Sequence, residues 1–136
     1  MTEQAPGGDA DWQLAAQALV VELFARIDAR DIDGAVALYA PDAVFPGAKG
    51  RPEIRETMLR GLLPNAGQRS RHLLGNLRSA PLGADSVLVR YTAVAYTMDG
   101  TVPLAARSVI DQEQVVRRRG GVLEVAEQRI PGFAAP

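Results

Sequence analysis

Residues 85–98, DSVLVRYTAVAYTM, decide the fold that we predict for this chain. Apolar and polar residues alternate along the stretch, which is rich in Val, Tyr and Thr, and this pattern is typical of a β-strand. Asp99-Gly100 follows directly and is a strong signal for a two-residue hairpin. Residues 101–119 should therefore return alongside, and Pro103 indicates an edge or a bulge in that returning strand.

Two further strands flank this hairpin. Residues 71–79 have the pattern of a strand, followed by a turn over residues 81–84. Residues 122–130 have the same pattern and follow a turn at Gly120-Gly121. The second half of the chain is therefore predicted to form an antiparallel sheet.

The pairing in the hairpin assigns the side chains to two faces of the sheet. If Met98 pairs with Thr101, Tyr91 lies opposite Ser108 and the strands alternate from there. The face that should cover the helices carries Val87, Val89, Tyr91, Ala93, Ala95, Leu104, Ala106 and Ile110. The other face carries Leu88, Arg90, Thr92, Val94, Tyr96, Arg107, Val109 and Asp111. This second face is too apolar for open solvent and too charged for a core, so we expect a homodimer through the outer sheet face.

The first half of the chain has helical periodicity. From residue 12 to about residue 30, apolar residues recur at helical spacing, and Val21 and Phe24 widen their stripe. The stripe consists of Trp12, Ala16, Leu19, Val20, Leu23 and Ile27. A second helix should run through Val36, Leu38 and Tyr39 until Pro41 stops it.

A brief strand over residues 43–45 and a third helix complete the first half. The third helix begins at Pro52, presents Ile54, Met58, Leu59 and Leu62, and ends at residues 64–67. Helices followed by an antiparallel sheet predict the α+β class. We expect residues 1–10 to be a flexible lead-in and residues 11–133 to form a single domain.

Composition excludes several classes of function. The net charge of −1, with acids and bases interspersed, argues against a nucleic-acid partner. The basic cluster at residues 117–119 precedes Gly120-Gly121 and is interpreted as a solvated hairpin tip. No apolar run approaches a membrane span, and residues 1–10 lack the features of a signal peptide, so we expect a cytoplasmic protein without membrane contact. The absence of cysteine excludes disulfides and thiolate sites.

His72 is the only histidine of the chain, and acid–base chemistry that needs an imidazole depends on it. It shares one face of its strand with Leu74, Asn76 and Arg78. Periodicity leaves open whether that face or the opposite leucine face points towards the helices. One histidine without cysteine argues against a metal site, and no nucleophile-elbow motif indicates a serine hydrolase.

Several segments resemble the SnoaL-like family, the polyketide-cyclase-like branch of the nuclear transport factor 2-like superfamily. They are residues 27–31 (IDARD), residues 37–45 (ALYAPDAVF), residues 50–54 (GRPEI), the His72…Asn76 strand and residues 120–125 (GGVLEV). The resemblance implies a cone, in which a strongly bent antiparallel sheet wraps around the helices and leaves a pocket at the open end. It also implies that His72 points into the cone.

The site pattern is nearest to the scytalone dehydratase and hexachlorocyclohexane dehydrochlorinase branch. This resemblance implies a catalytic pair, Asp28 and His72, with Asn76 beside it. It implies a cofactor-independent lyase, isomerase or cyclase that abstracts a proton from a small apolar or polycyclic ligand, with no metal. The other residues that we expect to bind substrate are Phe24, Tyr39, Phe45, Leu59 and Tyr91, with either tyrosine as a donor to an oxyanion.

Two alternatives stay open. One is a non-catalytic binding or assembly module, like the small subunit of ring-hydroxylating dioxygenases. The other is an epoxide hydrolase of the same fold, which resemblance would build on an Asp–Arg–Asp set. Arg90, Arg107 and Asp111 fall on the outer predicted face, which counts against that set.

Overall fold

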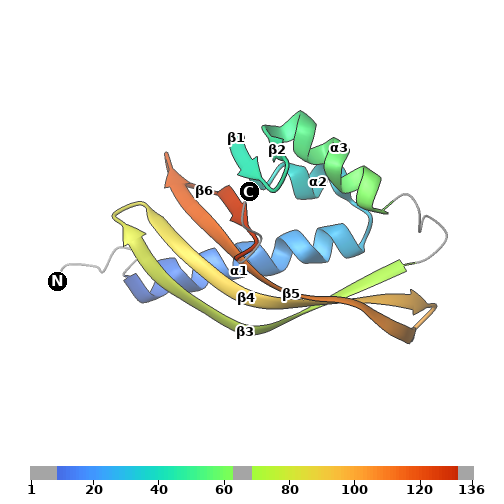
Figure 1. Ribbon diagram of the computed structural model, residues 1–136. Helices are drawn as coiled ribbons and strands as arrows, with labels where there is room; N and C mark the ends of the chain where they lie inside the picture. The colour runs from blue at the N-terminus through green and yellow to red at the C-terminus, as the bar shows by residue number, and fades with distance from the viewer. Residues whose placement is uncertain (1–8, 63–68, 132–136) are drawn as a thin grey trace.

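The computed structural model describes residues 9–62 and 69–131, and within them the chain forms three helices and six strands (Figure 1). The helices are α1 (Asp9–Asp28), α2 (Ile32–Val36) and α3 (Arg51–Leu62). The strands are β1 (Tyr39–Phe45), β2 (Ala48–Lys49), β3 (Arg69–Gly83), β4 (Ser86–Asp99), β5 (Val102–Arg119) and β6 (Val122–Arg129). The predicted α+β class is confirmed. No helix of the described residues is long and apolar enough to cross a membrane.

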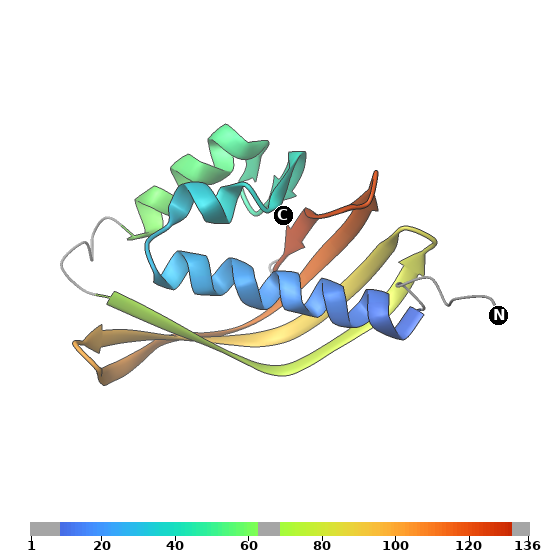
Figure 2. The same ribbon diagram turned by 180° about the vertical axis from the view of Figure 1, so that it is seen from behind.

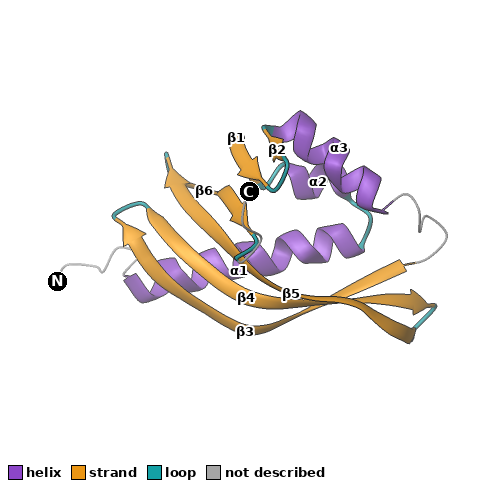
Figure 3. Ribbon diagram, in the orientation of Figure 1, coloured by secondary structure: helices purple, strands orange, loops and turns teal. Residues whose placement is uncertain are grey.

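The strands form one bent sheet in the order β2-β1-β6-β5-β4-β3. Neighbouring strands are antiparallel except β1 and β6, which run parallel, so the sheet is not wholly antiparallel as predicted. The long strands β3, β4 and β5 curve along α1, which lies on the concave side (Figures 1 and 2). Helices α2 and α3 lie above the far end of α1, beside the short strands β1 and β2 (Figure 3).

Helix α1 organises the core because it supplies side chains to two apolar clusters. Leu23 packs with α2, α3 and β1, whereas Trp12, Val20 and Phe24 pack against β4 and β5. The predicted apolar stripe is therefore confirmed. Val21 does not widen it, because this residue is 46% exposed.

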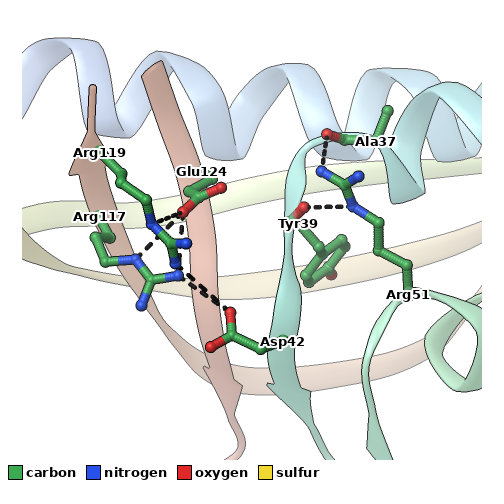
Figure 4. A network of polar contacts seen from close by, with 7 residues as sticks. All are labelled: Ala37, Tyr39, Asp42, Arg51, Arg117, Arg119 and Glu124. Carbon is green, nitrogen blue, oxygen red and sulfur yellow. Dashed lines mark hydrogen bonds and ion pairs between the residues drawn. The ribbon is translucent and has the colours of Figure 1, made fainter. Parts of the chain in front are cut away.

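The second helix is shorter than predicted. It ends at Val36, and Tyr39 begins strand β1 instead of extending the helix. The backbone carbonyls of Leu38 and Tyr39 accept hydrogen bonds from residues far away in the sequence instead of from a longer helix. The Leu38 carbonyl accepts from the backbone N–H of Val125 at 2.9 Å. The Tyr39 carbonyl accepts from Nε of Arg51 at 2.8 Å (Figure 4).

Ion pairs fix the other side of β1. Arg117 Nη2 contacts a carboxylate oxygen of Glu124 at 3.0 Å and one of Asp42 at 3.2 Å, and Arg119 Nε contacts Glu124 at 3.1 Å (Figure 4). The basic cluster at residues 117–119 was predicted to be a solvated hairpin tip. It does precede that turn, but Arg117 and Arg119 also join β5 to β6 and β1 through the carboxylates of Glu124 and Asp42.

The register of the β4–β5 hairpin differs from the prediction. The turn residues are Gly100 and Thr101, and the strand β5 carries register shifts opposite Ala95/Tyr96 and Thr97/Met98. Tyr91 consequently pairs with Gln112 rather than Ser108. The β4 half of the predicted inner face is correct, but Leu104 is exposed and Ala106 pairs with Tyr96 of the outer face.

Strand β3 is longer than predicted at both ends. It runs through residues 81–83, which were expected to turn, and the turn follows at Ala84 and Asp85. The predicted end of the third helix at residues 64–67 lies outside the described residues, as do residues 1–8 of the lead-in predicted over residues 1–10. Its last two residues are helical instead, because α1 begins at Asp9.

Candidate active site

Asp28 is the last residue of α1, and its carboxylate accepts hydrogen bonds from the start of β3. Oδ1 accepts from the Ser70 hydroxyl at 3.1 Å and contacts Nδ1 of His72 at 2.6 Å. Oδ2 accepts from the backbone N–H of His72 at 2.7 Å. The same helix is tied to β3 near its other end, where Ser79 bonds to Gln13 and Gln17. The Asp28–His72 contact therefore lies at one end of a helix that is anchored at both ends.

The hydrogen bonds decide the charge state of Asp28. Burial alone would raise the pKa of this carboxyl, but the ring and backbone N–H groups of His72, the positive charge of the ring and the Ser70 hydroxyl together hold its pKa below the usual 3.8. The carboxylate is thus ionised at neutral pH and only accepts. Nδ1 must then carry the proton, which leaves the lone pair of a neutral His72 on Nε2.

The surroundings of the pair are partly apolar. The His72 and Asp28 side chains are each 17% exposed. The Phe24 ring lies 5.0 Å from the His72 ring, and the Tyr91 ring packs edge-on against Phe24 at 5.5 Å. Such cover limits the access of water and strengthens the contact between carboxylate and imidazole.

His72 borders two hollows. The helix–strand groove, of about 570 Å³, lies between α1 and β3 and is lined by Phe24, Ala25, Asp28, Arg71, His72 and Leu74, among others. The inner hollow, of about 350 Å³, is lined by residues of helices α1 and α3 and of strands β1, β3, β4 and β5. Its lining includes Ile27, Phe45, Met58, His72, Arg107 and Ser108. His72 pairs with Ala95, which pairs with Ser108, so one row of the inner sheet face forms its floor. The two hollows make the imidazole reachable by a small molecule from either side.

Asn76 does not join His72 as expected. The β3–β4 register shifts between Gly75 and Arg78, and Asn76 lies in this bulge with φ +51°. A bulge turns the following side chains to the opposite face. Asn76 is exposed and lines a separate charged hollow together with Arg78 and Arg90. The expectation that His72 and Asn76 share a face was wrong for this reason.

The two tyrosines expected as oxyanion donors are both engaged by glutamines. The Tyr39 hydroxyl donates to Gln128, and the Tyr91 hydroxyl donates to Gln112 and accepts from Gln114. Burial raises the pKa of both phenols well above the usual range. Neither tyrosine lines the helix–strand groove or the inner hollow.

The remaining expected residues divide between the two hollows and the core. Phe45 lines the inner hollow and Phe24 the helix–strand groove, whereas Leu59 packs against the core cluster of α2, α3 and β1. Sequence reasoning missed Arg107, which it assigned to the outer face. Arg107 is the extra residue of the β5 bulge between Ala106 and Ser108, and it borders the inner hollow. Pro103 was the only signal of a bulge in that strand.

Metal binding has no donor set in this part of the molecule. Within residues 9–62 and 69–131, no three His, Cys, Asp or Glu side chains are grouped so that they could hold a metal ion.

Comparisons with known proteins agree on the fold. The family model of the SnoaL-like domain matches residues 10–129. Aln2 from a Streptomyces species is 16% identical with a TM-score of 0.80 over 93% of each chain. ActVI-ORFA from Streptomyces coelicolor is 18% identical with a TM-score of 0.73, over 85% of this chain and 93% of that chain. A Catenulispora acidiphila structure in complex with S-DNPA is 18% identical with a TM-score of 0.71, over 84% and 87%. A search of curated proteins gave no match.

Proposed function

The chain belongs to the SnoaL-like domain family, and from this premise we propose that it is a cofactor-independent lyase, isomerase or cyclase. The ligand we propose is a small apolar or polycyclic molecule, and the nearest site pattern is that of the scytalone dehydratase and hexachlorocyclohexane dehydrochlorinase branch. The observation that carries this proposal is the 2.6 Å contact between Asp28 Oδ1 and His72 Nδ1. It leaves Nε2 without a hydrogen-bond partner among the described residues, and His72 lines both hollows.

The proposed reaction begins with removal of a proton from a carbon next to a carbonyl group. Nε2 of His72 takes the proton, the C–H bonding pair becomes part of an enolate, and the ionised Asp28 stabilises the imidazolium that forms. In an elimination, the enolate pair expels hydroxide from the neighbouring carbon, and hydroxide takes the imidazolium proton to leave as water. In an isomerisation the proton returns to a different carbon. In a cyclisation the enolate carbon attacks a second carbonyl, whose oxygen takes the proton.

The lining of the inner hollow supports an apolar ligand. Ile27, Phe45 and Met58 supply its apolar walls, while His72 and Ser108 supply polar groups. A largely apolar cavity with few convergent polar groups is the usual form of a small-molecule site.

Proton abstraction can be tested without the natural substrate. We expect the protein to catalyse exchange of the α-protons of 2-tetralone in D2O, followed by NMR, faster than free imidazole at equal concentration. Replacing a general base costs about 100-fold or more in rate, so His72→Gln should lose most of the exchange. Circular dichroism establishes that the variant is folded. Equal exchange by the wild type and by folded His72→Gln would contradict the proposal.

A second candidate is ligand binding without chemistry. The observation that favours it is that Tyr39 and Tyr91 are held by glutamines away from both hollows, so the expected phenolic donor for an enolate oxygen is not beside His72. Saturable binding of 2-tetralone without exchange would favour this candidate over catalysis.

We also propose that two copies of the chain associate through the outer sheet face. Leu73, Val94 and Val109 form one cross-strand row on that face, and Val109 is 66% exposed. Light scattering should give a dimer mass for the wild type and a monomer mass for Val109→Asp, because a carboxylate would be buried in the interface. A monomeric wild type would rule this association out.

A further inference from the structure

Three arginines around the two hollows have no partner among the described residues. Arg69, Arg71 and Arg107 form no hydrogen bond or ion pair there, and each lines a hollow that His72 also lines. Arginines on other surfaces are engaged: Arg55 pairs with Asp33 at 2.7 Å, and Arg90 pairs with Glu113 at 2.8 Å. The net charge of the chain is −1, so this local excess of cations does not follow from a basic composition.

Arg107 is positioned by a local distortion of the sheet. Ala95 pairs with Ser108 and Tyr96 pairs with Ala106, which leaves Arg107 as an additional residue between them. Bulges of this kind redirect a side chain out of the regular alternation, and they occur often beside active sites. Without the bulge, Arg107 would point to the outer face; with it, Arg107 lines the inner hollow.

The carboxylate of the site does not neutralise this arginine. Asp28 already accepts from Ser70 and from the backbone and ring of His72, and it lines the helix–strand groove rather than the inner hollow. The inner hollow thus combines the guanidinium of the exposed Arg107, which has no ionic partner within residues 9–62 and 69–131, with an imidazole and apolar walls. A ligand that matches all three carries a negative charge on an apolar body.

Building on the proposed function, we propose that the ligand is an apolar carboxylic acid whose carboxylate binds to Arg107. The planar guanidinium presents two parallel N–H groups to a carboxylate, and this charge-assisted geometry also fixes the orientation of the ligand. The apolar body then lies against Phe45 and Met58, with the reacting C–H between Arg107 and the Nε2 of His72. Arg107 acts as a ligand-binding residue that selects acids over neutral molecules.

The test uses two probes of nearly the same shape, 2-naphthoate and 2-naphthamide, of which only the first carries a negative charge. Calorimetric titration of the full chain gives both affinities. His72 is the only histidine, so its imidazole NMR signals report binding at this site without assignment. We expect 2-naphthoate to bind at least about tenfold more tightly than 2-naphthamide, as the loss of a charge-assisted hydrogen bond predicts.

Variants assign this preference to Arg107. Arg107→Gln should weaken naphthoate binding about tenfold or more and leave naphthamide binding within about twofold. Arg107→Lys keeps the charge without the planar pair of N–H groups, and it should recover only part of the affinity. Arg55→Gln removes the same charge from an exposed position on α3 and is expected to change neither affinity.

The outcomes separate this inference from the proposed function. Equal binding of acid and amide, absence of naphthoate binding, or an equal effect of Arg107→Gln and Arg55→Gln would each overturn the role of Arg107. The exchange of 2-tetralone, which carries no carboxylate, would be unaffected by such a result. Conversely, unchanged exchange in His72→Gln would contradict the catalytic proposal. The preference for acids could still be measured by the same calorimetric titration.

Discussion

Replacing Asp28 with asparagine should invert the proton arrangement of His72. Three donors converge on the carboxylate: the Ser70 hydroxyl, the His72 backbone N–H and the His72 ring. An asparagine offers one accepting oxygen and one donating NH2 group. The backbone N–H cannot change its role, whereas the ring can change tautomer and the hydroxyl can rotate. The amide oxygen should therefore accept from the backbone, and the NH2 group should donate to Nδ1.

This arrangement moves the ring proton to Nε2 and removes the basic lone pair from the border of the hollows. The variant also replaces charge-assisted hydrogen bonds with neutral ones in a largely buried position. We expect a loss of about 1–3 kcal/mol in the free energy of unfolding, and at least a tenfold loss of proton exchange.

Nitrogen-15 NMR of the single histidine reads the tautomer directly, and urea unfolding at pH 7 gives the stability. Asp33→Asn is the matched control, because this carboxylate is 80% exposed and its one ion pair among the described residues is with Arg55. Retention of the Nδ1–H tautomer in Asp28→Asn, with wild-type stability, would refute the reasoning about how this carboxylate holds the ring.

Three further predictions concern stability. The pKa of Asp28 is lower in the folded than in the unfolded protein. Its ionised carboxylate therefore contributes to the free energy of unfolding above the unfolded pKa, and this contribution is lost as the pH falls through the folded pKa. Urea unfolding between about pH 5 and pH 2 should show a steeper loss of stability in the wild type than in Asp28→Asn. Tyr91→Phe should cost about 1–3 kcal/mol by chemical denaturation, because it leaves the buried Gln114 amide with only a 3.4 Å contact; an unchanged midpoint would mean that water replaces the hydroxyl. Glu124→Gln should lower the thermal midpoint more than Asp42→Asn, because Glu124 is the less exposed carboxylate that Arg117 and Arg119 share; equal shifts would contradict this ranking.

The fold could be predicted where one periodicity spans a whole element. The apolar stripe of α1 and the alternation of residues 85–98 are long enough for the burial of one face to determine the element, and both are confirmed. The secondary structure of short segments depends instead on contacts with residues far away in the sequence. Tyr39 has helical spacing from Val36, but its backbone carbonyl is bound by Arg51, which no local pattern indicates.

The candidate site depended on bulges, which alternation cannot locate. The family resemblance, not the alternation of residues, implied that Asp28 and His72 meet, and the structure brings them into contact at the end of α1 and near the start of β3. Asn76 and Arg107 lie in bulges and exchanged faces relative to the prediction. A single extra residue reverses every later assignment in a strand, and here only Pro103 hinted at one.

The parallel pairing of β1 with β6 has a consequence for how the chain folds. Val44 and Glu127 are in register although more than half of the chain separates them. Closing so long a loop is slow, since its entropy must be lost before the contact contributes. During synthesis, β6 is made after the other five strands, and until then Tyr39 and Ala40 lack the strand that pairs with β1. The contact between α1 and β3 closes a shorter loop, so the acid–base pair can assemble before the sheet is complete.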